Sequence, residues 1–129
     1  MMTAIQAHDR VDIEVETHYL DEQSDPENKR FVFSYFITIT NGEAEPVQLL
    51  TRHWVITDGD HHVQEVEGQG VIGEQPMIQP GDSYSYTSGT VISTEVGSMT
   101  GYYGMRTAGG DHFRAPVPAF TLALPNALH

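Results

Sequence analysis

FVFSYFITITNG, residues 31–42, has the strongest β-strand pattern in this chain. Its odd-numbered positions from 31 to 39 are all aromatic or β-branched apolar residues, and the positions between them are mixed in character. Such residues with a period of two are typical of a strand that buries one face. Asn41-Gly42 then supplies a turn signal. The segment therefore predicts a central antiparallel strand.

Segments with similar patterns lie on both sides of this strand. Val11–Tyr19 alternates apolar and acidic residues, as expected for a strand whose polar face guards a sheet edge. The further predicted strands are Val47–Thr57, His62–Val66, Met77–Gln79, Tyr84–Ser88, Met99–Thr107, His112–Ala115 and Ala119–Leu124. Asp21–Lys29 is predicted to be a loop, and no segment has a clear helical period.

Many short strands separated by Gly, Pro and Asn turns indicate an all-β fold. We predict an immunoglobulin/fibronectin type III-like β-sandwich of two antiparallel sheets, formed by one domain over residues 1–129, with residues 1–9 as a flexible tail. The spacing of Pro80-Gly81 and Tyr84 favours a sandwich corner in which the tyrosine hydroxyl bonds to nearby backbone.

The third strand carries the one tryptophan of the chain. Arg52 and Trp54 are expected to share a face with Leu50 and Ile56, which makes Trp54 the core tryptophan of the sandwich. Arg52 then lies at the margin of the core. It either pairs with a carboxylate, stacks on an aromatic ring, or grips a phosphate or carboxylate ligand.

The charge balance restricts the classes of partner. The chain has 18 acidic residues against 6 lysines and arginines, and its net charge is −12. This field disfavours nucleic acid and anionic membrane and favours a basic protein surface or a cation. No apolar run approaches the roughly 20 residues of a membrane helix, and there is no cysteine. We expect a cytoplasmic protein.

The most tempting motif is a literal G-x-G-x-x-G at Gly68, Gly70 and Gly73. In dinucleotide-binding folds this motif connects a strand to a helix whose N-terminus meets the pyrophosphate. Here Gln75-Pro76 follows and no helix pattern does. Gly68, Gly70 and Gly73, together with Arg52, are therefore the candidate phosphate-binding residues, and a purely structural loop is the alternative.

The sequence gives less support to a metal site or to catalysis. His61 and His62 lie beside Asp58 and Asp60, but neighbouring residues on a strand point to opposite faces, so both histidines cannot readily ligate one ion. No nucleophile elbow or separated pair of carboxylates is recognisable. We expect no catalytic residues, no metal site and no cofactor.

Taken in order along the chain, the motifs resemble those of the bacterial ApaG proteins from Ile13 to His129. The motifs that carry the resemblance are Tyr19-Leu20 with Gln23-Ser24, Phe31–Tyr35, Val47–Trp54, Glu65–Pro76, Pro80-Gly81, Tyr86–Gly89, Met99–Tyr103 and Phe120–Leu122. The resemblance implies a fibronectin type III-like sandwich. It also implies protein recognition, since similar domains are attached to eukaryotic F-box proteins and to a DNA-polymerase-interacting protein.

The resemblance further implies a link to cobalt and magnesium resistance, which can only be indirect for a chain with no membrane segment. It places a phosphate-binding loop at Gly68, Gly70 and Gly73. The sequence thus predicts a non-enzymatic module that binds an unknown protein partner. The alternative is a sensor that binds a nucleotide or pyrophosphate, with a divalent cation between the phosphate and the acidic surface. Pairing of two copies through exposed sheet edges stays open.

Overall fold

The computed structural model describes residues 10–126, almost entirely as β-strands. The strands are β1 (Val11–Tyr19), β2 (Phe31–Asn41), β3 (Val47–Asp58), β4 (Val63–Gln69), β5 (Met77–Ile78), β6 (Ser83–Ile92), β7 (Val96–Thr107) and β8 (His112–Ala123). The predicted loop between β1 and β2 contains two single-turn 3₁₀ helices, Asp21–Gln23 and Pro26–Asn28. The expected flexible tail, residues 1–9, lies outside the described residues.

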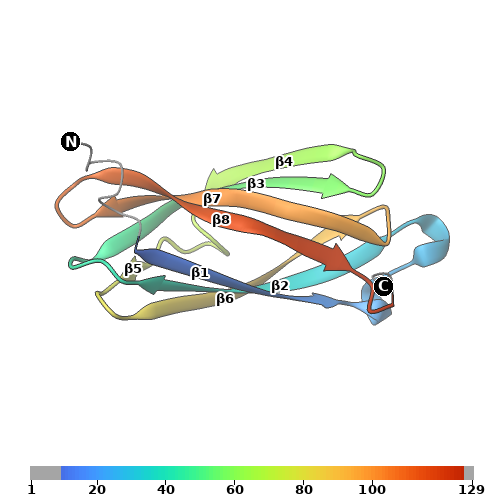
Figure 1. Cartoon of the computed structure of the whole chain (residues 1–129), viewed down its shortest axis with the longest axis horizontal. Helices are drawn as coiled ribbons and strands as arrows, with labels where there is room; N and C mark the ends of the chain where they lie inside the picture. Colours follow the sequence, from blue (N-terminus) through green and yellow to red (C-terminus); the bar gives the residue numbers. More distant parts are fainter. Residues whose placement is uncertain (1–9, 127–129) are drawn as a thin grey trace.

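The strands form two antiparallel sheets that pack face to face, which confirms the predicted sandwich (Figure 1). The smaller sheet has the order β1-β2-β6, and the larger has the order β4-β3-β7-β8 with β5 paired to β3. On one side of the sandwich β1 lies next to β8, and the Thr17 hydroxyl donates to the carbonyl of Thr121. The other side of the sandwich lies between edge strands β4 and β6.

The core confirms the face predicted for residues 31–39. Phe33, Ile37 and Ile39 are fully buried, while Phe36 on the opposite face is exposed. β1 alternates between half-buried apolar and exposed polar positions, also as predicted. The inner faces of both sheets therefore supply one continuous core.

Aromatic rings fill the centre of this core. Trp54 makes edge contacts with Tyr35, Tyr103 and Phe120, at centroid distances of 5.7, 5.8 and 5.9 Å. The hydroxyls of Tyr86 and Tyr103 hydrogen-bond across the two sheets, and burial raises the pKa of both far above the ordinary value. The expected corner is wrong: within residues 10–126 the Tyr84 hydroxyl makes no hydrogen bond to backbone.

A β-bulge in β3 corrects a second expectation. The register with β7 shifts between Leu49 and Thr51, so Leu49 is buried on the same side as Trp54, while Leu50 is turned away. Two adjacent leucines satisfy the apolar pattern equally well, and the sequence alone favoured the wrong one. Arg52, Trp54 and Ile56 do share the inner face, as predicted.

The two segments predicted after residue 111 form one continuous strand, β8. Pro116 and Pro118 interrupted the sequence pattern because proline cannot donate to a sheet ladder. β8 is an edge strand of the larger sheet, where a proline nitrogen can face away from the neighbouring strand without losing a hydrogen bond.

Candidate functional site

Gly68 and Arg52 lie opposite each other on β4 and β3, where the missing side chain of glycine makes room for the guanidinium. A Cβ atom on Gly68 would lie 2.7 Å from Nη1 of Arg52 and 2.8 Å from its Cζ and Nη2. The flat guanidinium therefore rests on the backbone of Gly68. Arg52 Nη1 also donates to the carbonyls of Gln69 and Gly70, at 3.1 and 3.0 Å.

Gly70 begins a loop that folds back on itself. Its φ is +65°, and a Cβ atom there would overlap the carbonyl oxygen of Glu74. The amide of Gly70 donates to Leu50, and the amides of Val71 and Glu74 donate to each other's carbonyls. Val71 is fully buried and anchors the loop in the core. These three amides are therefore engaged within the protein.

Gly73 lies at the exposed tip of the same loop. Its φ is +81°, and nothing lies within 4 Å of the position a Cβ would take. The adjacent amides of Ile72 and Gly73 have no acceptor among residues 10–126. The structure thus brings Gly68, Gly70 and Arg52 into contact and leaves Gly73 at the tip. Phosphate binding by these four residues stays a prediction.

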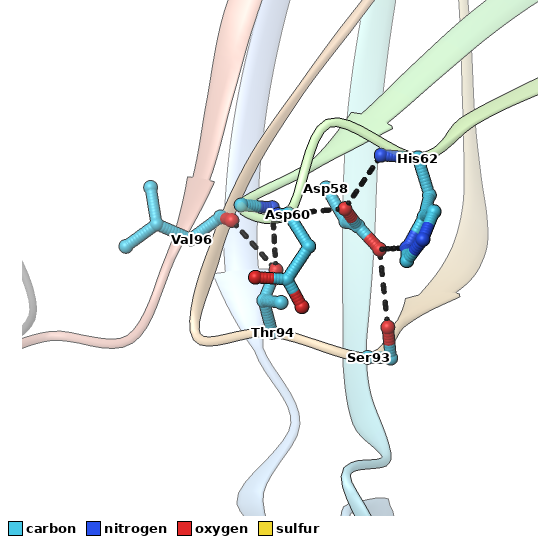
Figure 2. Close-up of polar contacts among 7 residues, drawn as sticks. Asp58, Asp60, His62, Ser93, Thr94 and Val96 are labelled. Carbon is cyan, nitrogen blue, oxygen red and sulfur yellow. Dashed lines mark hydrogen bonds and ion pairs between the residues drawn. The ribbon is translucent and has the colours of Figure 1, made fainter.

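Asp58 organises the turn that the sequence singled out for its acids and histidines (Figure 2). Its carboxylate accepts the amides of Asp60 and His62, at 2.8 and 3.0 Å, and the Ser93 hydroxyl, at 3.1 Å. The His62 ring lies 3.3 Å away. Because Ser93 follows β6, this carboxylate ties the β3–β4 turn to the other sheet.

The same turn is fixed by a second, shorter chain of hydrogen bonds. The Gly59 amide donates to the Thr94 hydroxyl, which donates to the carbonyl of Val96 (Figure 2). The His62 amide bond is the main cause that lowers the pKa of Asp58, with Asp60, Ser93 and the His62 ring adding to it against partial desolvation. No group of three or more metal-ligating side chains occurs in the part of the chain that the structure describes.

A row of polar and aromatic side chains crosses the outer face of the larger sheet, and sequence reasoning missed it. We call it the Tyr102 row: Glu67 on β4, His53 on β3, Tyr102 on β7 and Arg114 on β8. The rings of His53 and Tyr102 stack with centroids 4.9 Å apart, and Arg114 Cζ lies 4.3 Å from the Tyr102 centroid. Since β3 and β8 flank β7, the two cover opposite faces of the tyrosine ring.

His53 is held in the row by carboxylates as well. Its Nδ1 lies 3.1 Å from Glu67, its Nε2 lies 3.8 Å from Glu65, and its side chain is only 17% exposed. Hollows of about 230 Å³ and about 380 Å³ lie along the row, and Thr51 and Tyr102 line both. The residues of the Tyr102 row are far apart in the sequence and come together only through the pairing of β4, β3, β7 and β8. The sequence did not reveal this pairing, because the bulge in β3 shifts its register with β7.

The described residues contain no helix that is long and apolar enough to cross a membrane.

We expect Gly70→Ala to destabilise the protein by at least about 1–2 kcal/mol, because the left-handed backbone and the Glu74 carbonyl both oppose a side chain. Gly68→Ala should cost much less, since only the end of a flexible arginine must move. Urea unfolding of both variants checks this. Equal losses for the two would contradict the assigned roles, and Gly70 is for this reason a poor position at which to test ligand binding.

Asp58→Asn should lower the thermal unfolding temperature at neutral pH, because the amide keeps one acceptor oxygen and loses the other. The folded state lowers the pKa of Asp58, so its stabilisation is present above the ordinary value of 3.8 and is lost as pH falls through the folded value. The difference from the unsubstituted protein should therefore shrink below about pH 4. Asp60→Asn, which removes the same charge from the same turn, is the control. A difference that persists unchanged at low pH would contradict this account.

A protein-family model and curated proteins both match this chain. Residues 21–107 match the family model described as the ApaG domain. The chain is 54% identical over 120 residues to Protein ApaG of Pseudomonas fluorescens, covering 93% of this chain and 95% of that protein. It is 56% identical to Protein ApaG of Pseudomonas aeruginosa strain LESB58, with the same coverage.

Solved structures lead to the same conclusion. A crystal structure of a protein from Bordetella pertussis superposes with a TM-score of 0.88 at 43% identity, over 90% of this chain and 94% of that one. A protein from Archaeoglobus fulgidus, with a TM-score of 0.56 at 7% identity over 88% of this chain and 97% of that one, shares the fold alone. This chain belongs to the ApaG family.

Proposed function

We propose that this protein is a non-enzymatic interaction module that binds a partner protein on the outer face of its larger sheet. The observation that carries the proposal is the Tyr102 row with the hollows beside it. Aromatic and arginine side chains dominate the binding energy of protein interfaces, particularly beside pockets that a partner's side chains can fill. Tyr102 is clamped on both faces, so little of its conformational freedom remains to be lost on binding.

The charges on this face suggest how a partner is oriented. Arg106, His112 and Arg114 gather on β7 and β8, whereas Glu65 and Glu67 lie at the opposite edge on β4. Two of the six lysines and arginines of this acidic chain are therefore on one part of one face. A partner with acidic groups facing β8 and basic groups facing β4 is complementary.

The surroundings of His53 support a non-enzymatic role. Within the described chain its ring nitrogens face two glutamates, and no serine or threonine hydroxyl hydrogen-bonds to them. Any effect on cobalt or magnesium resistance is then indirect and passes through the partner. The cytoplasmic location expected from the sequence stays a prediction.

Tyr102→Ala and Arg114→Glu should each abolish capture of a specific partner from a lysate of the source cells, while both variants remain folded at the temperature of the experiment. Paired pull-downs with the unsubstituted protein and a Thr38→Ala, Ser85→Ala control on the outer face of the smaller sheet measure this. The proposal predicts a protein retained by the unsubstituted chain and the control but by neither Tyr102 row variant. The same proteins retained by all four baits would contradict it.

One observation favours the alternative of a nucleotide or pyrophosphate sensor. The amides of Ile72 and Gly73, which have no acceptor in the part of the chain that the structure describes, form a pair of adjacent donors at the exposed loop tip, and backbone donors of this kind bind phosphate in other proteins. Glu74 beside them is exposed, so a divalent cation would have to offset its charge.

If the loop tip binds phosphate, calorimetric titration with ATP or pyrophosphate should show saturable binding that depends on Mg²⁺. Gly73→Ala should weaken it by straining the tip where φ is positive, while no neighbouring atom is displaced. Absence of heat with both ligands, with and without Mg²⁺, would eliminate this alternative.

A further inference from the structure

A cavity of about 390 Å³ opens between the two sheets, on the side where β4 and β6 form the edges. Ile56 and Val66, which lie on the paired strands β3 and β4 at the inner face of the larger sheet, contribute apolar side chains to its lining. A second hollow of about 450 Å³, which shares Ile56, Gln64 and Val91, continues it toward Lys29 and Arg30. This is a separate place from the Tyr102 row, which lies on the outer face of the larger sheet.

Arg52 brings an unpaired positive charge to this cavity. No carboxylate among residues 10–126 pairs with its guanidinium, in a protein with three times as many acidic as basic residues. Its Nη1 is occupied by the carbonyls of Gln69 and Gly70, which leaves Nη2 and Nε without an acceptor in the described chain. These two groups form one edge of the guanidinium, the edge that binds a carboxylate through two parallel bonds.

The indole of Trp54 is a second, independent observation that points to a ligand in this cavity. The residue is 2% exposed, yet its indole Nε1 has no hydrogen-bond partner among residues 10–126. Buried polar atoms are nearly always paired, because an unpaired one loses its bonds to water without replacement.

The orientation of the indole directs this N–H toward the cavity. A Cβ atom on Gly101 of β7 would lie 3.1 Å from Cε3 of Trp54, so the six-membered ring is turned toward β7. The edge that carries Nε1 is then turned toward β4, on the opposite side of β3. Trp54 lines the same cavity as Arg52.

The smaller sheet contributes hydroxyl groups to the other wall. Tyr35 and Ser88 are cross-strand neighbours on β2 and β6. Both line the cavity. Burial raises the pKa of Tyr35 above its ordinary value of 10.0, so its hydroxyl is neutral at neutral pH, as an unshifted tyrosine would be, and can donate.

We propose that this inter-sheet cavity binds a small carboxylic acid with an apolar tail, its carboxylate held by the Arg52 guanidinium and the Trp54 indole N–H. One positive charge between apolar walls matches a planar monoanion. Among the described residues Arg52 is the one lysine or arginine that lines this cavity, whereas Lys29 and Arg30 line the second hollow, so the second negative charge of a phosphate dianion would have no cation beside it. The apolar tail lies against Ile56 and Val66.

The test uses the fact that Trp54 is the only tryptophan of the chain. A ¹⁵N-labelled protein therefore gives one indole N–H cross-peak, which should move downfield and saturate as butyrate is added at constant ionic strength. Hexanoate should bind more tightly than butyrate and acetate more weakly, by roughly three- to four-fold per methylene group. Butyramide, which has the same shape without the charge, should give no saturable shift.

Two variants test the assigned residues. Arg52→Gln should weaken butyrate binding about tenfold or more. Because Arg52 also holds the loop, Gly68→Ala is the second variant: it keeps the arginine but pushes the guanidinium off its position, and it should also weaken binding. Arg10→Gln, which removes one positive charge at the start of β1, should leave the affinity unchanged.

Several results would overturn the proposal. These are no saturable shift with any of the three carboxylates, equal binding of butyramide, unchanged affinity in both Arg52→Gln and Gly68→Ala, or tighter binding of inorganic phosphate than of butyrate. Because the titrations use the purified protein without a partner, their outcome does not depend on whether a partner protein binds the outer face.

Discussion

The bulge between Leu49 and Thr51 is the constraint on which both candidate surfaces depend. Before it, Val47 and Leu49 face the core; after it, Arg52, Trp54 and Ile56 do. A regular strand would have turned Arg52 and Trp54 to solvent and His53 into the core, since a shift of one residue exchanges the faces of a strand. One extra residue thus places the indole at the centre of the sandwich and His53 beside Tyr102.

The two sides of the sandwich are built differently. β1 and β8 lie together and share the Thr17 bond to the Thr121 carbonyl, whereas β4 and β6 leave room between them. The Asp58 turn bridges the sheets at one end of this second side through Ser93. Between that bridge and the loop held by Arg52, Ile56 and Val66 line space instead of filling it.

The sequence predicted the buried face of a strand correctly wherever the spacing of apolar residues allows only one choice. The odd-numbered positions of residues 31–39 are all apolar, so the inner face of β2 could be predicted position by position, although Val32 between them is buried as well. At Leu49-Leu50 the pattern is degenerate, because either leucine can be buried and only packing against β7 selects one. The prolines of β8 misled for a different reason: their cost depends on whether the strand lies at an edge, which is a property of the sheet and not of the segment.

For the candidate sites as well, features set by the pattern within one strand could be predicted, whereas contacts between strands could not. Gly70 could be assigned a structural role from its residue type, and Arg52 a place at the core margin from its period. The pairing of Gly68 with the Arg52 guanidinium could not be derived, because it requires the register of β3 against β4. The Tyr102 row requires the registers of all four paired strands at once. Contacts that cross several strands are beyond what the spacing within one strand can encode.

Arg52 lines both the inter-sheet cavity and the smaller hollow on the outer face, and only the backbone of Gly68 separates its guanidinium from that outer surface. At this point only the backbone of Gly68 lies between the two hollows that Arg52 lines. A ligand that moves the guanidinium from one side alters the surface offered on the other. Thermodynamic linkage then requires that occupants of the two sides change each other's affinity by the same factor, whichever of them arrives first.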